Sequence, residues 1–77
     1  MKKVGQILAE ARKSKGLSFE EIESAIKIRR QTLRQLEAGD WESLPSSIFV
    51  KGLLKNYGRF LGIPTEDLLA FYRREFD

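Results

Sequence analysis

Three glycines limit this chain to short helices. Gly16, Gly39 and Gly62 each follow a stretch whose apolar residues recur every three or four positions, which is the period of an α-helix. A glycine at the end of such a stretch is typical of the left-handed residue that terminates a helix. No segment alternates apolar and polar residues as a strand would. The pattern therefore predicts an all-α chain.

Further signals divide the chain into five helices. Ser18 and Glu21 have the spacing of a capping box, in which each side chain binds a free backbone N–H of the other residue. Trp41 and Leu44 can anchor the loop that follows Gly39. The first expected helix spans 4–15, and the second runs from the cap at 18 to 25 or 26. A short turn at 27–28 precedes a third helix that ends at 38. The last two span 46–61 (or from 47) and 64 onward (or from 65).

Length and composition allow one small domain over residues 1–77. The 77 residues are too few for two cores, and 42% hydrophobic with 32% charged residues suits a folded globular chain. The helical period predicts a core made of Leu8, Ile22, Ile28, Leu33, Leu36, Val50, Leu54, Tyr57 and Leu61.

The second and third helices, joined by a tight turn at Lys27, have the pattern of a helix-turn-helix unit. The whole chain is therefore predicted to be a five-helix domain of phage-repressor type. Such a unit places the start of its second helix in the DNA major groove, where arginine can bind guanine and glutamine can bind adenine. The candidate DNA-binding residues are Arg29, Arg30, Gln31 and Arg34. A solvated basic face or a protein-docking role explains the same residues equally well.

Three positions count against DNA binding. Helix-turn-helix units that bind DNA usually have a small residue at the position of Glu23 and a glycine at the position of Lys27. A lysine fits this turn only if its backbone does not need a positive φ. Phe19 stands where a phosphate-binding glutamine is common, and an aromatic ring cannot make that bond.

The fourth helix has an unusually wide apolar side. Val50, Leu54, Tyr57 and Leu61 form one stripe at 100° per residue. A second stripe contains Phe49, Leu53 and Phe60, and the basic Lys51, Lys55 and Arg59 lie on the opposite side. Either both stripes are core, or part of the second is an exposed protein-binding patch with Lys51 and Lys55 beside it.

Composition favours a binding role over catalysis. The chain has no histidine and no cysteine, which removes the commonest bases, nucleophiles and metal ligands. No apolar run approaches the roughly 20 residues that span a bilayer. We therefore expect a soluble, cytoplasmic chain that is no enzyme and has no cofactor or metal.

Many of these residues together resemble a known family. They are Gly5, Ala11-Arg12, Gly16-Leu17-Ser18, Glu20-Glu21, Ile28-Arg29, Leu33, Leu36 to Trp41, Leu44-Pro45, Gly52, Tyr57, Leu61-Gly62 and Leu68-Leu69. The chain resembles the cytoplasmic domain of RodZ, a family of bacterial cell-shape proteins. The most specific part is the acidic-aromatic link into Leu44-Pro45, followed by a glycine and a tyrosine.

The resemblance implies the N-terminal cytoplasmic part of a longer protein with one membrane helix. It also implies binding to MreB, the bacterial actin homologue, through fourth-helix positions that match Phe49 and Leu53. The sequence departs from the family pattern in three places. Leu53 replaces a usual aromatic residue, Arg30 a usual proline and Glu23 a usual alanine. Sequence-specific DNA binding stays open as the alternative function, and weak nucleic-acid binding is compatible with either.

Overall fold

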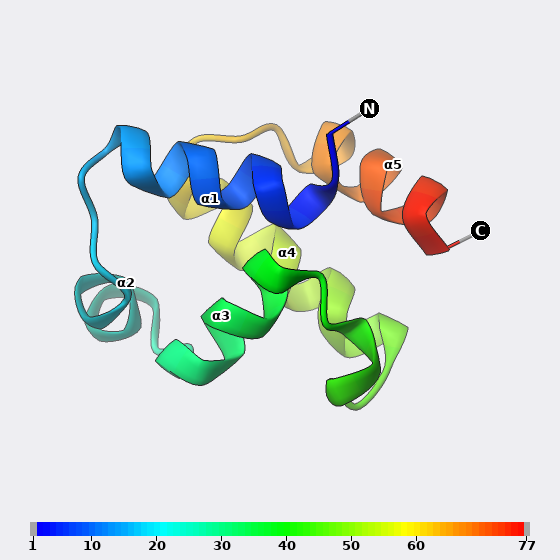
Figure 1. The fold of residues 1–77 in the computed structure, drawn as a ribbon, viewed down its shortest axis with the longest axis horizontal. Helices are drawn as coiled ribbons and strands as arrows, with labels where there is room; N and C mark the ends of the chain where they lie inside the picture. The colour runs from blue at the N-terminus through cyan, green and yellow to red at the C-terminus, as the bar shows by residue number, and fades with distance from the viewer. Residues whose placement is uncertain (1, 77) are drawn as a thin grey trace.

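The computed structural model describes residues 2–76, except for the side chain of residue 76, and this part of the chain is helical with short connections. Its elements are α1 (Val4–Ser14), α2 (Phe19–Ile26), α3 (Arg30–Ala38), the short 3-10 helix η1 (Trp41–Ser43), α4 (Ser47–Leu61) and α5 (Thr65–Phe76). Figure 1 shows their order along the chain. The predicted all-α, five-helix architecture is confirmed. No helix among the described residues is long and apolar enough to cross a membrane.

Local capping accounts for most helix ends. At the start of α2, the Glu21 backbone N–H donates to Ser18 Oγ over 3.1 Å, and the Ser18 backbone N–H donates to Glu21 Oε1 over 2.9 Å. Gly39 and Gly62 follow α3 and α4 with φ of 70° and 80°. The predicted capping box and glycine terminators are therefore confirmed.

The turn between α2 and α3 differs from its prediction. Lys27 has φ 61° and ψ 33°, which is the left-handed conformation. The condition under which a lysine was expected to fit this turn is therefore not met, because the chain reverses within three residues to start α3 at Arg30 and Lys27 takes the positive φ. A side chain in this conformation costs about 1–2 kcal/mol through the approach of its Cβ to the following carbonyl.

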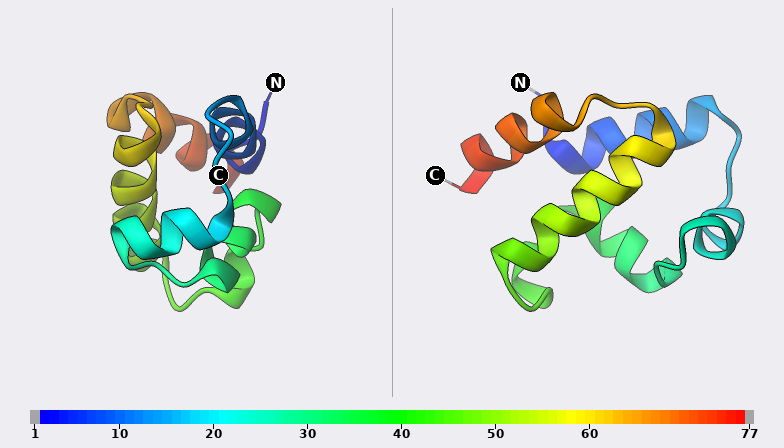
Figure 2. Two further views of the ribbon diagram at one scale, coloured as in Figure 1. Left: turned by 90° about the vertical axis from the view of Figure 1, so that its left-hand side faces the viewer. Right: turned by 180° about the vertical axis from the view of Figure 1, so that it is seen from behind.

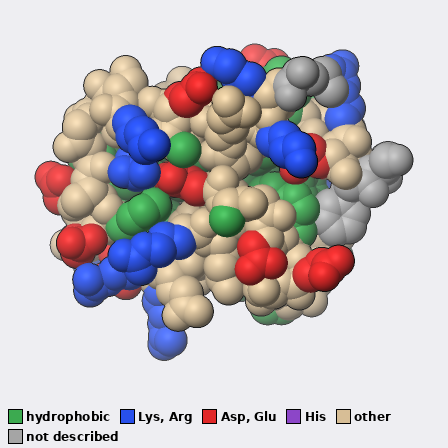
Figure 3. Space-filling model, in the orientation of Figure 1, with side chains coloured by type: hydrophobic (Ala, Val, Ile, Leu, Met, Phe, Trp, Pro, Cys, Tyr) green, Lys and Arg blue, Asp and Glu red, His purple; other side chains and the backbone are tan. Residues whose placement is uncertain are grey.

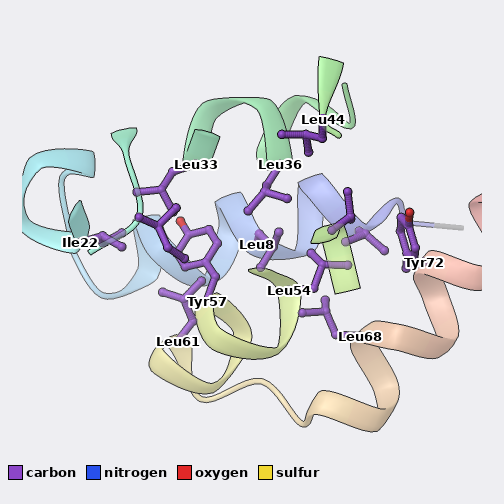
Figure 4. Packing of buried hydrophobic residues seen from close by; sticks show 13 residues of the cluster. Leu8, Ile22, Leu33, Leu36, Leu44, Leu54, Tyr57, Leu61, Leu68 and Tyr72 are labelled. Carbon is purple, nitrogen blue, oxygen red and sulfur yellow. The ribbon is translucent and has the colours of Figure 1, made fainter. Parts of the chain in front are cut away.

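Helices α1, α3 and α4 enclose the centre of the core, and α5 closes one side (Figure 4). All nine predicted core residues are buried, and Val4, Leu44, Leu68 and Tyr72 are buried with them. Gly5 lies where α1 crosses α3. A Cβ at this position would lie 2.1 Å from the Glu37 carbonyl oxygen, so only glycine allows the two helices to approach this closely.

The loop after α3 is pinned to α5, as its two apolar residues predict. The Trp41 ring contacts the Tyr72 ring edge to face, with centroids 5.2 Å apart, and Leu44 is buried. Trp41 Nε1–H donates to Glu75 Oε2 over 3.1 Å, and the Val4 backbone N–H also donates to the Glu75 carboxylate. Glu75 therefore joins the start of α1 to the end of α5, which lie at the same end of the molecule in Figure 2.

Candidate protein-docking site

Helix α4 turns only one of its two apolar stripes into the core. The Ser46 hydroxyl caps the helix by accepting from the Phe49 backbone N–H over 3.1 Å. From this start, the stripe Val50, Leu54, Tyr57 and Leu61 is buried. The second stripe is not: Phe49 is 45% exposed and Phe60 36% exposed, while Leu53 is partly buried against the core. Exposed aromatic residues on one helix face are typical of a protein-binding surface.

A groove runs beside this stripe, between α4 and the helix-turn-helix. Its volume is about 300 Å³, and it is lined by Lys27, Ile28, Arg29, Thr32, Phe49 and Leu53. Ile28 is buried, whereas Lys27, Arg29 and Phe49 are exposed. Two of the predicted docking residues, Phe49 and Leu53, thus come together with the turn that precedes α3. Phe60, Lys51 and Lys55 are exposed on α4 and do not line the groove.

The position of α4 depends on a partly buried ion pair between α1 and α3. Arg12 Nε donates to Glu37 Oε2 over 2.8 Å and Arg12 Nη2 to Glu37 Oε1 over 3.1 Å, with side chains only 15% and 9% exposed. The Tyr57 hydroxyl donates to Glu37 Oε2 over 2.6 Å. Residues from α1, α3 and α4 therefore meet at one carboxylate, which limits rotation of α4 about its own axis.

The same cluster shifts two pKa values. The hydrogen bonds and charge of Glu37 raise the pKa of Arg12 against the effect of its burial. Burial, followed by the hydrogen bond to the Glu37 carboxylate, raises the pKa of Tyr57 far above its ordinary value. Both shifts favour the protonated forms of Arg12 and Tyr57, which donate the hydrogen bonds to Glu37, so the cluster has a structural role.

The four candidate DNA-binding residues are all exposed at the start of α3. Lys and Arg side chains gather at the lower left of Figure 3, over α2 and the start of α3. Two of these cations have partners within the domain. Arg30 Nε donates to Glu23 Oε1 over 3.2 Å, and the Arg30 backbone N–H donates to Glu23 Oε2 over 3.0 Å. The Arg34 guanidinium lies 5.3 Å from the centre of the Phe19 ring.

These contacts explain two of the unusual residues. Glu23 and Arg30, which both depart from the family pattern, form one ion pair, and the Glu23 carboxylate also caps the first N–H of α3. The Phe19 ring, which cannot bind phosphate, instead stacks with Arg12 at 4.2 Å. Neither partnership was predicted, because the paired residues lie on different helices.

The groove also contains residues that the sequence analysis did not assign to docking. Lys27 and Thr32 were given no binding role, Ile28 was assigned to the core alone, and Arg29 was assigned to DNA. Outside the groove, the 81% exposure of Ile48 at the start of α4 was not predicted either. The spacing of Lys27 and Phe49 along the chain carries no signal of their proximity, which the crossing of α3 and α4 creates. Among the described residues, no group of histidine, cysteine or carboxylate side chains is arranged to hold a metal ion.

Comparisons with known proteins place this fold in a family. The model of the family described as "Helix-turn-helix domain" matches residues 7–68. "Cytoskeleton protein RodZ" of Streptococcus pneumoniae (strain ATCC BAA-255 / R6) is 31% identical over 71 residues, which are 92% of this chain and 26% of the relative. No solved structure gives a significant match.

Two further relatives extend the comparison. An "Uncharacterized protein" of Haemophilus influenzae (strain ATCC 51907 / DSM 11121 / KW20 / Rd) is 37% identical over 62 residues, 78% of this chain and 20% of the relative. "Uncharacterized membrane protein YmfM" of Bacillus subtilis (strain 168) is 24% identical over 59 residues, 77% of this chain and 20% of the relative. The chain thus spans between a fifth and about a quarter of the length of these relatives. With its family match across most of the chain, the protein belongs to the helix-turn-helix domain family and is a RodZ-like member of it.

Proposed function

We propose that this domain is a non-catalytic adaptor that binds the actin-like MreB filament through α4. The observation that carries the proposal is the exposure of Phe49 and Phe60 on a helix whose other apolar stripe is fully used by the core. Its likeness to a protein named as a cytoskeleton protein supports a filament partner. In a longer protein, a membrane segment would hold this domain at the cytoplasmic face of the inner membrane and link the filament to it during rod-shaped growth.

Phe49 and Leu53 are the proposed anchors, because they are one turn apart on the exposed side of α4 and both line the groove. Phe60 extends the same stripe toward the end of the helix. Lys51 and Lys55 are exposed on the same helix outside the groove, and as charges flanking the docked filament they would raise the association rate with an acidic surface more than the final affinity.

Replacement of Phe49 tests the proposal. An aromatic anchor at the centre of an interface typically contributes at least about 2 kcal/mol, so Phe49→Ala should weaken co-sedimentation with MreB filaments roughly thirtyfold. The matched control is Phe71→Ala, which removes a partly buried ring from α5 instead. Thermal melts of both variants show whether the domain is folded. If the Phe49→Ala domain is folded and co-sediments with filaments as strongly as the wild-type domain does, α4 is not the docking surface.

DNA binding is the second candidate, and the exposure of Arg29, Arg30, Gln31 and Arg34 at the start of α3 favours it. If about four phosphates are neutralised, the logarithm of the binding constant should fall with the logarithm of salt concentration with a slope near −3.6. We expect only weak, sequence-independent binding, measured by fluorescence anisotropy with unrelated duplexes. Nanomolar affinity for one defined sequence at physiological salt would favour a transcriptional regulator over the adaptor.

A further inference from the structure

The groove between α4 and the turn before α3 combines an apolar floor with a cationic edge. Ile28 and Leu53 are its more buried apolar residues, and exposed Lys27, Arg29 and Phe49 stand at its edge. No acidic side chain that the structure describes lines it. At about 300 Å³ it is at the lower limit of small-molecule pockets, and it lies open on the surface. Its size and position suit a side chain presented by another protein better than a free ligand.

The two cations at this edge, Lys27 and Arg29, differ from the neighbouring Arg30 and Arg34. Arg30 is paired with Glu23, and Arg34 lies over the Phe19 ring. Across the residues that the structure describes, neither Lys27 nor Arg29 has a side-chain hydrogen bond or an ion pair. Of these four cations near the start of α3, the two that remain available to a partner are therefore the two at the groove.

The backbone conformation of Lys27 destabilises the fold. Its φ of 61° is a conformation that glycine adopts without strain and a lysine does not. Within the described part of the domain, no hydrogen bond or ion pair of its side chain offsets that strain. A side chain that destabilises its own turn and lines a groove is typical of a residue with a binding role.

We propose that this groove binds an acidic docking element of the filament subunit, in which an apolar side chain fills the space above Ile28 and Leu53 and neighbouring carboxylates pair with Lys27 and Arg29. This rests on the proposed function and adds the chemistry of the partner's contact. Charge complementarity selects this occupant, because two unpaired cations flank an apolar floor that no acidic side chain among residues 2–75 lines.

The test uses a variant that removes both charges without harming the fold. Lys27→Gly relieves the left-handed lysine and should raise the melting temperature by roughly 4–8 °C. Combined with Arg29→Gln, it should weaken co-sedimentation with MreB filaments on the order of tenfold at low salt, as expected for two ion pairs at an interface edge. Wild type and variant should converge as salt is raised. The matched control is Lys13→Gln/Lys15→Gln, which removes two exposed charges near the end of α1 and should bind like wild type.

The outcomes separate this inference from the proposed function. One possible result is that Phe49→Ala loses filament binding while Lys27→Gly/Arg29→Gln keeps the affinity and the salt dependence of wild type. In that case α4 is the docking surface, but the partner does not present an acidic element to the groove. Equal loss in the Lys13/Lys15 control would show a general charge effect and would also refute the inference. If wild type does not pellet with filaments, the proposed function fails and this inference with it. A last result would be that duplex DNA displaces the filament and that Lys27→Gly/Arg29→Gln loses affinity for DNA but not for the filament. The two cations would then bind nucleic acid, and the inference would be refuted.

Discussion

Two glycines inside helices, Gly5 and Gly52, differ in whether there is space for a Cβ atom. Gly5 lies against the α3 backbone, where a Cβ would come within 2.1 Å of the Glu37 carbonyl oxygen and 2.6 Å of its carbon. Gly52 lies on the exposed side of α4, with nothing within 4 Å of a Cβ position. The same substitution should therefore change stability in opposite directions at the two sites.

Gly5→Ala should lower the free energy of unfolding by roughly 1–3 kcal/mol or more, because backbone atoms cannot yield as a flexible side chain can. Gly52→Ala should raise it by up to about 1 kcal/mol through better helix propensity. Urea titrations of both variants measure these changes. A Gly5→Ala domain as stable as wild type would show that α1 and α3 can separate at little cost.

At the scale of single elements, α2 depends on its capping box. It is the shortest of the α-helices, with 8 residues and one fully buried side chain, Ile22. Ser18→Ala removes the bond to the Glu21 N–H and should cost about 1 kcal/mol, the usual effect of losing such a cap. Ser24→Ala, on the exposed side of the same helix, is the matched control and should not destabilise. Thermal unfolding followed by circular dichroism compares the two, and equal effects would contradict the capping role.

The same box makes α2 sensitive to acid. The hydrogen bond from the Ser18 backbone N–H, followed by that from its hydroxyl, lowers the pKa of the Glu21 carboxyl below its ordinary value. Because the folded state favours the ionised form, this contribution is present above the glutamate pKa of about 4.3 and is lost as the pH falls through the lowered pKa. In Glu21→Gln this part of the pH dependence should be absent, which urea titrations across acidic pH can measure.

For the molecule as a whole, Glu75 joins the two ends of the described fold. Its carboxylate accepts from the Val4 backbone N–H and from Trp41 Nε1, so it connects α5 to α1 and to the loop at η1. Glu75→Ala should lower the free energy of unfolding by about 1.5–3 kcal/mol, since both hydrogen bonds are to a charged acceptor. Arg73→Ala, an exposed neighbour on the same helix, should change it by less than about 0.5 kcal/mol. Similar losses in denaturant titrations of the two variants would show that the Glu75 bonds contribute little.

The amino-acid sequence by itself determined most of the helix ends and one buried apolar stripe on each helix, while the second stripe of α4 stayed open between core and surface. A cap such as Ser18 with Glu21 is made within one turn of chain, and a glycine terminator such as Gly39 acts on its own backbone. Burial of one side of each helix follows from the helical period. All of these are short-range effects, so residues close in sequence are sufficient to predict them.

The tertiary structure alone decided which surface is left for a partner. The pairing of Arg12 with Glu37 joins residues 25 positions apart, and the groove brings Lys27 and Arg29 beside Phe49. Whether Phe49 is core or surface depends on how α4 rotates against α1 and α3, and the buried contact of Tyr57 with Glu37 restricts that rotation. Such contacts depend on the packing of several helices at once, and the helical period is the same whether a second apolar stripe meets a neighbouring helix or solvent.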